Sequence, residues 1–165
     1  MRRLILIFVV LLVVYCVKHD LTPDEIMGMR KIVCASGDEA LKIVKEMHVG
    51  EIRYVQDITL LHYVGEYSFV TVWVTVYPNE SVAFEEMNRM ASSMVKFGWK
   101  NLSKVEMNGY SVYVVVPPKG KGKQYFWCVK NVAYYIIPHN MTELEIRYFI
   151  LNLSSPSLTT AKPPR

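Results

Sequence analysis

The stretch YSFVTVWVTVY, residues 67–77, decides the fold because apolar side chains occupy both of its faces. The residues alternate at the two-residue period of a β-strand. One face carries Val70, Val72, Val74 and Val76, and the other carries Tyr67, Phe69, Thr71, Trp73, Thr75 and Tyr77. A strand that is apolar on both sides predicts a central place in a sheet that is covered on both faces.

The flanking sequence predicts the neighbours of this strand. A second β-rich run precedes it over residues 51–64, and Gly65 and Glu66 separate the two runs as a hairpin turn would. Pro78 ends the central strand. Asn79 can cap a helix whose apolar stripe reaches Phe97, and Gly98 favours a helix end.

From Trp99 onward the sequence predicts a four-stranded antiparallel meander. The strands are expected over residues 99–107, 110–116, 124–130 and 132–137, with Asn108-Gly109 as a type I′ turn. The loop PPKGKGK is interpreted as a solvated hairpin tip, and a contact with a small anion or a lipid headgroup is the alternative. A capping box from Thr142 to Glu145 predicts a closing helix that ends near Leu153.

On the amino-terminal side, two helices are expected, over residues 22–33 and 36–48, because Thr22-Pro23-Asp24-Glu25 and Ser36-Gly37-Asp38-Glu39 both resemble helix starts. The predicted fold class is therefore α+β. It comprises an N-terminal hydrophobic anchor helix followed by one mostly antiparallel sheet of about six strands (hairpin, helix, four-strand meander) with helices packed on it.

The front of the chain, LILIFVVLLVVYCV at residues 4–17, follows Arg2 and Arg3 and has the layout of a topogenic signal. Basic residues at its start place the N-terminus inside and the following domain on the extracytoplasmic side. Cleavage of a signal peptide normally needs small residues at the cleavage site, but the first glycine is Gly28 and the first alanine is Ala35. An uncleaved membrane anchor is therefore favoured. A buried parallel strand of a cytosolic domain is the alternative. Lipidation of Cys16 is disfavoured, since Tyr15 precedes it.

Three segments follow from this pattern: a signal or anchor over residues 1–19, an extracytoplasmic α+β domain over 20–153, and a disordered Ser/Thr/Pro tail over 154–165. The formal charge of +4 is misleading, because five basic residues lie outside the domain and all 15 acids lie within it. The domain is near neutral, so a nucleic-acid partner is not expected.

No motif for catalysis, metal binding or a cofactor is found, and none is expected. Cys34, His62 and Asp57 are the nearest approach to a nucleophile, a base and an orienting acid. Two cysteines lie outside the predicted anchor, Cys34 and Cys128. They are candidates for a disulfide bond, and two independent thiols are the alternative.

Two surface features favour an exported binding domain. Four N-x-S/T sequons, at Asn79, Asn101, Asn140 and Asn152, are candidate glycosylation sites, although helix capping also explains some of them. Seven aromatics would form a ligand platform if their face were uncovered, and core packing is the competing explanation. They are Tyr67, Phe69, Trp73, Tyr77, Tyr113, Tyr125 and Trp127.

The expected function is a membrane-anchored extracytoplasmic binding or assembly domain without catalysis. Its partners would be the membrane, through residues 4–17, and an unknown protein or a small apolar or sugar ligand. A small exported hydrolase and a structural cell-surface component are the two alternatives.

Overall fold

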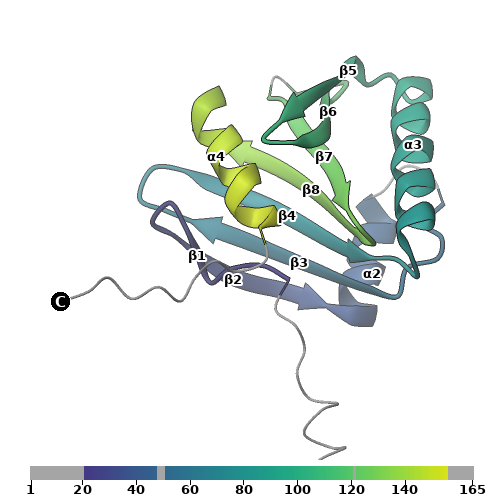
Figure 1. The fold of residues 1–165 in the computed structure, drawn as a ribbon, viewed down its shortest axis with the longest axis horizontal. Helices are drawn as coiled ribbons and strands as arrows, with labels where there is room; N and C mark the ends of the chain where they lie inside the picture. The colour runs from purple at the N-terminus through teal and green to yellow at the C-terminus, as the bar shows by residue number, and fades with distance from the viewer. Residues whose placement is uncertain (1–20, 48–50, 121, 156–165) are drawn as a thin grey trace, which may run out of the picture.

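A computed structural model describes residues 21–47, 51–120 and 122–155, which form a single eight-stranded antiparallel sheet with three helices packed on it (Figure 1). The strand order is β1-β2-β3-β4-β8-β7-β6-β5. The strands are β1 Glu25–Ile26, β2 Met29–Ser36, β3 Asp57–Val64, β4 Phe69–Val76, β5 Lys100–Met107, β6 Tyr110–Val116, β7 Gln124–Val129 and β8 Val132–His139. The helices are α2 Gly37–Met47, α3 Glu80–Lys96 and α4 Glu143–Ser154.

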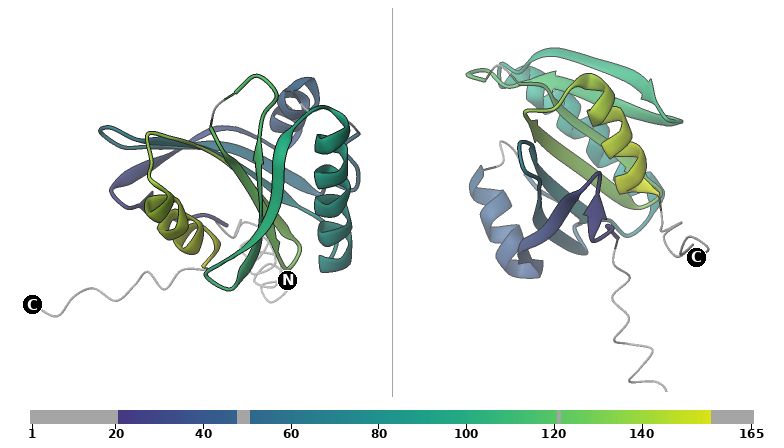
Figure 2. Two further views of the ribbon diagram at one scale, coloured as in Figure 1. Left: turned by 90° about the horizontal axis from the view of Figure 1, so that it is seen from above. Right: turned by 90° about the vertical axis from the view of Figure 1, so that its left-hand side faces the viewer.

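Strand β4 is central, as its sequence predicts. It pairs along its whole length with β3 on one side and β8 on the other, so it joins the first half of the chain to the second. Val70, Val72 and Val74 are buried on the face covered by α4, which we call the α4 face. Trp73 lies on the opposite face, which α2 and α3 share and which we call the α2–α3 face (Figure 2).

The α4 face holds the larger core. Ile146, Phe149, Ile150 and Leu153 of α4 are all buried there, against side chains from the middle strands and against Ile26 and Met29 of the β1–β2 hairpin. Helix α4 contacts both β1 and β5, which are the two edges of the sheet. The sheet must therefore twist strongly enough to bring its edges towards one helix.

The helix expected over residues 22–33 is wrong, because the structure places a β-hairpin there. Ile26 and Met29 are buried on the α4 face, and Met27 and Gly28 connect them with φ angles of 53° and 78°. Positive φ at both positions of a two-residue loop is the geometry that matches the twist of two antiparallel strands. The hairpin adds two strands, so the sheet has eight rather than about six.

Other elements confirm the sequence-based expectations. Asn79 caps α3 by accepting a hydrogen bond from the Val82 amide at 3.0 Å, and Gly98 has a φ of 81° just beyond the end of that helix. Asn108 and Gly109, with φ angles of 54° and 82°, form the expected turn between β5 and β6.

The expected anchor over residues 4–17 and most of the expected tail lie outside the described residues. Among the helices of the part that is described, none has both the length and the apolar character needed to span a bilayer.

The capping box of α4 provides a test of local stability. The Thr142 hydroxyl accepts from the Glu145 amide, and the Glu145 carboxylate accepts from the Thr142 amide at 2.6 Å. Replacing Thr142 with alanine is expected to lower the free energy of unfolding by about 1 kcal/mol, measured by denaturant titration. Ser92→Ala, in the exposed part of α3, is the control and is expected to change it by less than about 0.5 kcal/mol.

The same box predicts a pH dependence. Hydrogen bonds from Thr142 hold the pKa of Glu145 below its ordinary value. Because the folded-state pKa is the lower one, the contribution is complete above the unfolded-state pKa and is lost as pH falls through the folded-state pKa. Alanine at position 142 would keep the main-chain amide, so the variant for this test is Glu145→Ala. The difference in free energy of unfolding between wild type and Glu145→Ala should shrink as the pH falls, and an unchanged difference would contradict this assignment.

Candidate binding grooves

A row of four aromatic rings crosses the α2–α3 face. Trp73, Tyr135, Phe126 and Tyr113 stand directly opposite one another on β4, β8, β7 and β6. Their ring centroids are 5.0, 5.9 and 4.9 Å apart along the row, and each pair is stacked. Cross-strand aromatic pairs of this kind stabilise a sheet beyond the area they bury.

Helix α3 covers the middle of this row. Phe126 is fully buried, with Ala83, Met87, Ala91 and Met94 of the helix packed in the same cluster. Trp73 and Tyr113, at the two ends of the row, are only half buried. The row therefore reaches a separate groove on each side of α3.

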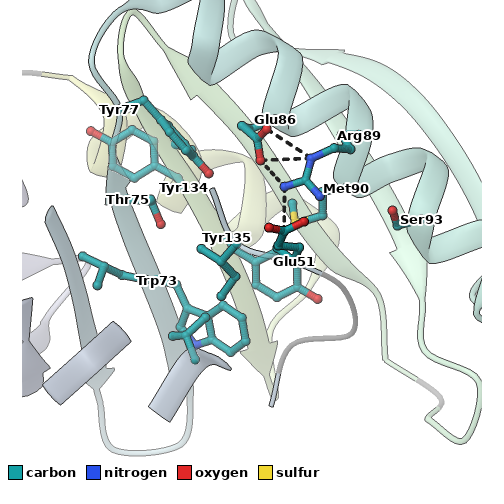
Figure 3. Close-up of a pocket in the computed structure, with 14 residues that line it drawn as sticks. Glu51, Trp73, Thr75, Tyr77, Glu86, Arg89, Met90, Ser93, Tyr134 and Tyr135 are labelled. Atoms are coloured by element: carbon teal, nitrogen blue, oxygen red, sulfur yellow. Dashed lines mark hydrogen bonds and ion pairs between the residues drawn. The ribbon is translucent and has the colours of Figure 1, made fainter. Parts of the chain in front are cut away.

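The first groove lies between α2 and α3, and we call it the α2–α3 cleft (Figure 3). Trp73, Thr75 and Tyr135 form its floor, and Met90 and Ser93 of α3 stand on one wall. Its free volume is about 50 Å³. That volume accommodates a few water molecules or one small chemical group, because a water needs roughly 10–15 Å³ measured in this way.

An ion pair closes one side of the cleft. Glu86 is buried on α3, and its carboxylate accepts from Arg89 Nε at 3.1 Å to both oxygens. Arg89 Nη2 also donates to the carbonyl oxygen of Glu51 at 2.7 Å, which attaches the segment that follows α2 to α3.

Tyr77 also lines this cleft. Burial, with a smaller contribution from the nearby Glu86 carboxylate, raises the pKa of Tyr77 to about 12, so this phenol is neutral at physiological pH.

The second groove lies between the first half of α3 and strands β5 to β7, and we call it the Lys104 groove. It is lined by Glu80, Ser81, Phe84, Met87, Lys104, Ser111, Tyr113, Trp127, Cys128 and Lys130. Its free volume is about 480 Å³. Small-molecule sites in proteins commonly measure about 300–1,000 Å³, so this groove has room for a ligand whereas the α2–α3 cleft does not.

Lys104 is the polar centre of the second groove. Its ammonium lies 5.2 Å from the Tyr113 ring centroid and 5.6 Å from the Phe84 ring centroid, so it contacts the faces of two rings. No carboxylate within residues 21–47, 51–120 and 122–155 lies in ion-pair range of it. The Tyr113 hydroxyl donates to Asn88 Oδ1, which fixes the ring against α3.

The seven aromatics of the predicted platform do not share one surface. Tyr125 and Trp127 face α4 and are fully buried. Trp73 and Tyr77 line the α2–α3 cleft, and Tyr113 lies in the Lys104 groove. Phe69 stacks on the His139 ring and meets the His62 ring at a tilt of 60°. Tyr67 is exposed in the β3–β4 turn.

The structure does not bring Cys34 and Cys128 together. Cys34 is exposed on β2 and Cys128 is half buried on β7, with β3, β4 and β8 between them, and both are free thiols. Neighbouring strands are about 4.8 Å apart. The separation is far beyond the roughly 7 Å that Cα atoms joined by a disulfide can span.

The two thiols should differ in reactivity. Burial, with a smaller contribution from Glu80, raises the pKa of Cys128, and Lys104 offsets only part of this effect. Since the thiolate is the nucleophile, iodoacetamide should modify the exposed Cys34 first and Cys128 more slowly. Peptide mass mapping over time measures both rates. Equal rates, or a Cys34–Cys128 bridged peptide, would contradict the structure.

The four sequon asparagines are all exposed. The side-chain amides of Asn140 and Asn152 donate to the carbonyl oxygens of Tyr67 and Tyr148, at 3.1 and 2.7 Å. Asn79 uses its side-chain oxygen for the α3 cap, as the capping explanation requires.

Residues considered for catalysis do not converge in either groove. Asp57 and His62 are five residues apart in β3, or about 16 Å along an extended strand. Cys34 lies at a β-bulge, and its thiol donates weakly to the carbonyl oxygen of Ile32. The described ranges, 21–47, 51–120 and 122–155, hold no group of three or more His, Cys, Asp or Glu side chains placed to bind a metal.

Sequence reasoning missed Phe84, Lys104 and Lys130 as site residues. Phe84 follows the buried Ala83 by one position in α3, so it lies beside the buried stripe of the helix and is half exposed. The usable signal was the register of the Asn108-Gly109 hairpin, which places Lys104 directly opposite Tyr113.

Comparison with known proteins adds no assignment: no family model, no curated protein and no solved structure matches this chain.

Proposed function

We propose that this chain is a membrane-anchored extracytoplasmic domain that binds, without catalysis, a small organic anion with a flat apolar body in the Lys104 groove. The observation that carries the proposal is the Lys104 ammonium, which lies over two rings in a ligand-sized groove and has no acidic partner among the described residues.

The chemistry of the groove selects the ligand class. An anionic group can pair with Lys104, and Lys130 adds a second positive charge on the same lining. Phe84 and Tyr113 offer ring faces on which a flat apolar body can stack. Glu80 is the acid on this lining, so it opposes a second negative charge and favours a monoanion.

The anchoring half of the proposal rests on residues 4–17 and the arginines before them. All four sequon asparagines are exposed, so each is open to glycosylation in an exported domain. This exposure supports the proposed location. A single sharp mass equal to that of the unmodified chain, from a host that glycosylates, would end the glycan proposal.

Binding can be tested with a probe of the proposed class. The full chain in lipid nanodiscs is dialysed to equilibrium against 2-naphthoate, and against the neutral 2-naphthylmethanol, with empty nanodiscs as the blank. We expect naphthoate to bind and Lys104→Met to weaken it about tenfold, which corresponds to about 1.4 kcal/mol for a charge-assisted contact.

Lys96→Met is the matched control, because it removes the same charge from the far end of α3. It should bind naphthoate as wild type does. The proposal fails if Lys96→Met and Lys104→Met behave alike, or if the neutral alcohol binds as tightly as the acid.

A further inference from the structure

Helix α4 is apolar on two opposite faces. Its buried face uses Ile146, Phe149, Ile150 and Leu153. A second row, Leu144, Tyr148 and Leu151, follows the same helical spacing on the outer side, where these side chains are 63%, 52% and 36% exposed. We call it the outer stripe. A surface helix normally presents charged and polar side chains to water on its outer side. An exposed apolar row in that place indicates a surface that contacts a membrane or another protein.

The described chain begins beside the end of this helix. Leu21, 39% exposed, is its first residue, and the Pro23 carbonyl oxygen accepts from the Tyr63 hydroxyl at 2.6 Å. The Tyr63 ring packs edge-on against Phe149 of α4, at 5.2 Å between centroids. Figures 1 and 2 both show the start of the β1 segment next to the last turn of α4.

The length of chain before Leu21 limits its distance from the membrane. Val17 ends the apolar run, and four residue steps of fully extended chain span at most about 14 Å. The run itself, as a helix, is about 21 Å long against a hydrocarbon core of about 30 Å. Such a mismatch draws the flanking residues towards the bilayer.

Charge along α4 agrees with this orientation. Glu143 and Glu145 lie in its first turn, at the end remote from Leu21. The last turn, residues 151–154, is LNLS and carries no charged side chain. The end of α4 beside Leu21 therefore has no acid of its own that an anionic lipid surface would repel.

We propose that the outer stripe rests in the headgroup region of the membrane in which residues 4–17 are anchored, with Leu151 deepest, then Tyr148, and Leu144 furthest out. The inference depends on the proposed anchoring. Tyrosine is enriched at membrane interfaces because it joins an apolar ring to a polar group. Leu144 and Leu151 are about 10 Å apart along the helix axis, which gives the proposal a depth gradient.

The test places a fluorescent label at each position. The full chain first loses its native cysteines through Cys16→Ser, Cys34→Ser and Cys128→Ala. A single cysteine is then introduced as Leu144→Cys, Tyr148→Cys or Leu151→Cys. This cysteine is labelled with the fluorophore NBD. Phe97→Cys is the matched control, since Phe97, just beyond α3, is also 52% exposed. Each protein is reconstituted into vesicles of phosphatidylcholine and phosphatidylglycerol, with or without headgroup-proximal nitroxide lipid.

We expect nitroxide lipid to cause a roughly twofold loss of fluorescence at 151, a smaller loss at 148, the least at 144 and none at 97, as for residues seated in the interface. Equal values at 97 and 148 in protein that floats with the vesicles would overturn the inference and leave the anchor intact. Failure to float would overturn the anchoring itself. Shielding of the label at 148 that depends on protein concentration and not on lipid would overturn the inference in favour of a second copy of the chain.

Discussion

Replacing Phe149 with alanine is expected to lower the free energy of unfolding by about 3–5 kcal/mol, the cost of removing a large aromatic side chain from a closed core. Phe149 is fully buried, meets Tyr63 edge-on, and belongs to the helix that contacts both edges of the sheet. Denaturant titration measures the effect.

Tyr148→Ala is the control for Phe149→Ala, because it removes a neighbouring ring from the outer side of the same helix. In detergent solution it should change the free energy of unfolding by less than about 0.5 kcal/mol. Similar losses for the two variants would mean that α4 is not seated as described.

The second large effect is expected for Arg89→Met, which should lower the free energy of unfolding by about 2–3 kcal/mol. The Glu86 side chain is 8% exposed and would keep a charge without a counter-ion, while the 34% exposure of Arg89 reduces the cost below that of a fully buried pair. Loss of the hydrogen bond from Arg89 to the Glu51 carbonyl oxygen adds to it.

A double variant separates these causes. Glu86→Gln combined with Arg89→Met removes the stranded charge and should recover more than half of the lost stability. If the double variant is no more stable than Arg89→Met alone, the loss comes from the Glu51 contact or from packing, and the buried charge is not its source.

Parts of the fold with strong local signals were predictable from the sequence. The valine alternation placed β4 at the centre, and Asn79, Asn108-Gly109 and the Thr142 box gave element boundaries that the structure confirms. The β1–β2 hairpin was not predictable in this way. Thr22-Pro23-Asp24-Glu25 resembles a helix start, and Met27-Gly28 is not a usual hairpin turn, yet burial of Ile26 and Met29 beneath α4 decides the outcome.

The site was harder to predict because strands with two apolar faces hide their orientation. In QYFWCV, residues 124–129, both faces are apolar or aromatic, so the sequence does not tell which side Tyr125 and Trp127 take. The register of β7 with β8 turns them to α4 and turns Phe126 and Cys128 to α3. A lysine on an edge strand ordinarily points to solvent. The function proposed for Lys104 depends on the Tyr113 ring of β6 and the Phe84 ring of α3, and the sequence of β5 alone does not reveal these neighbours.

Protease treatment of intact spheroplasts that produce the full chain tests the central claim most directly. If residues 4–17 anchor an extracytoplasmic domain, added protease should degrade the domain while a cytosolic marker survives, and untreated protein should sediment with the membrane. Complete protection of the domain until the spheroplasts are lysed would contradict the account, because the grooves and the outer stripe of α4 would then face the cytosol.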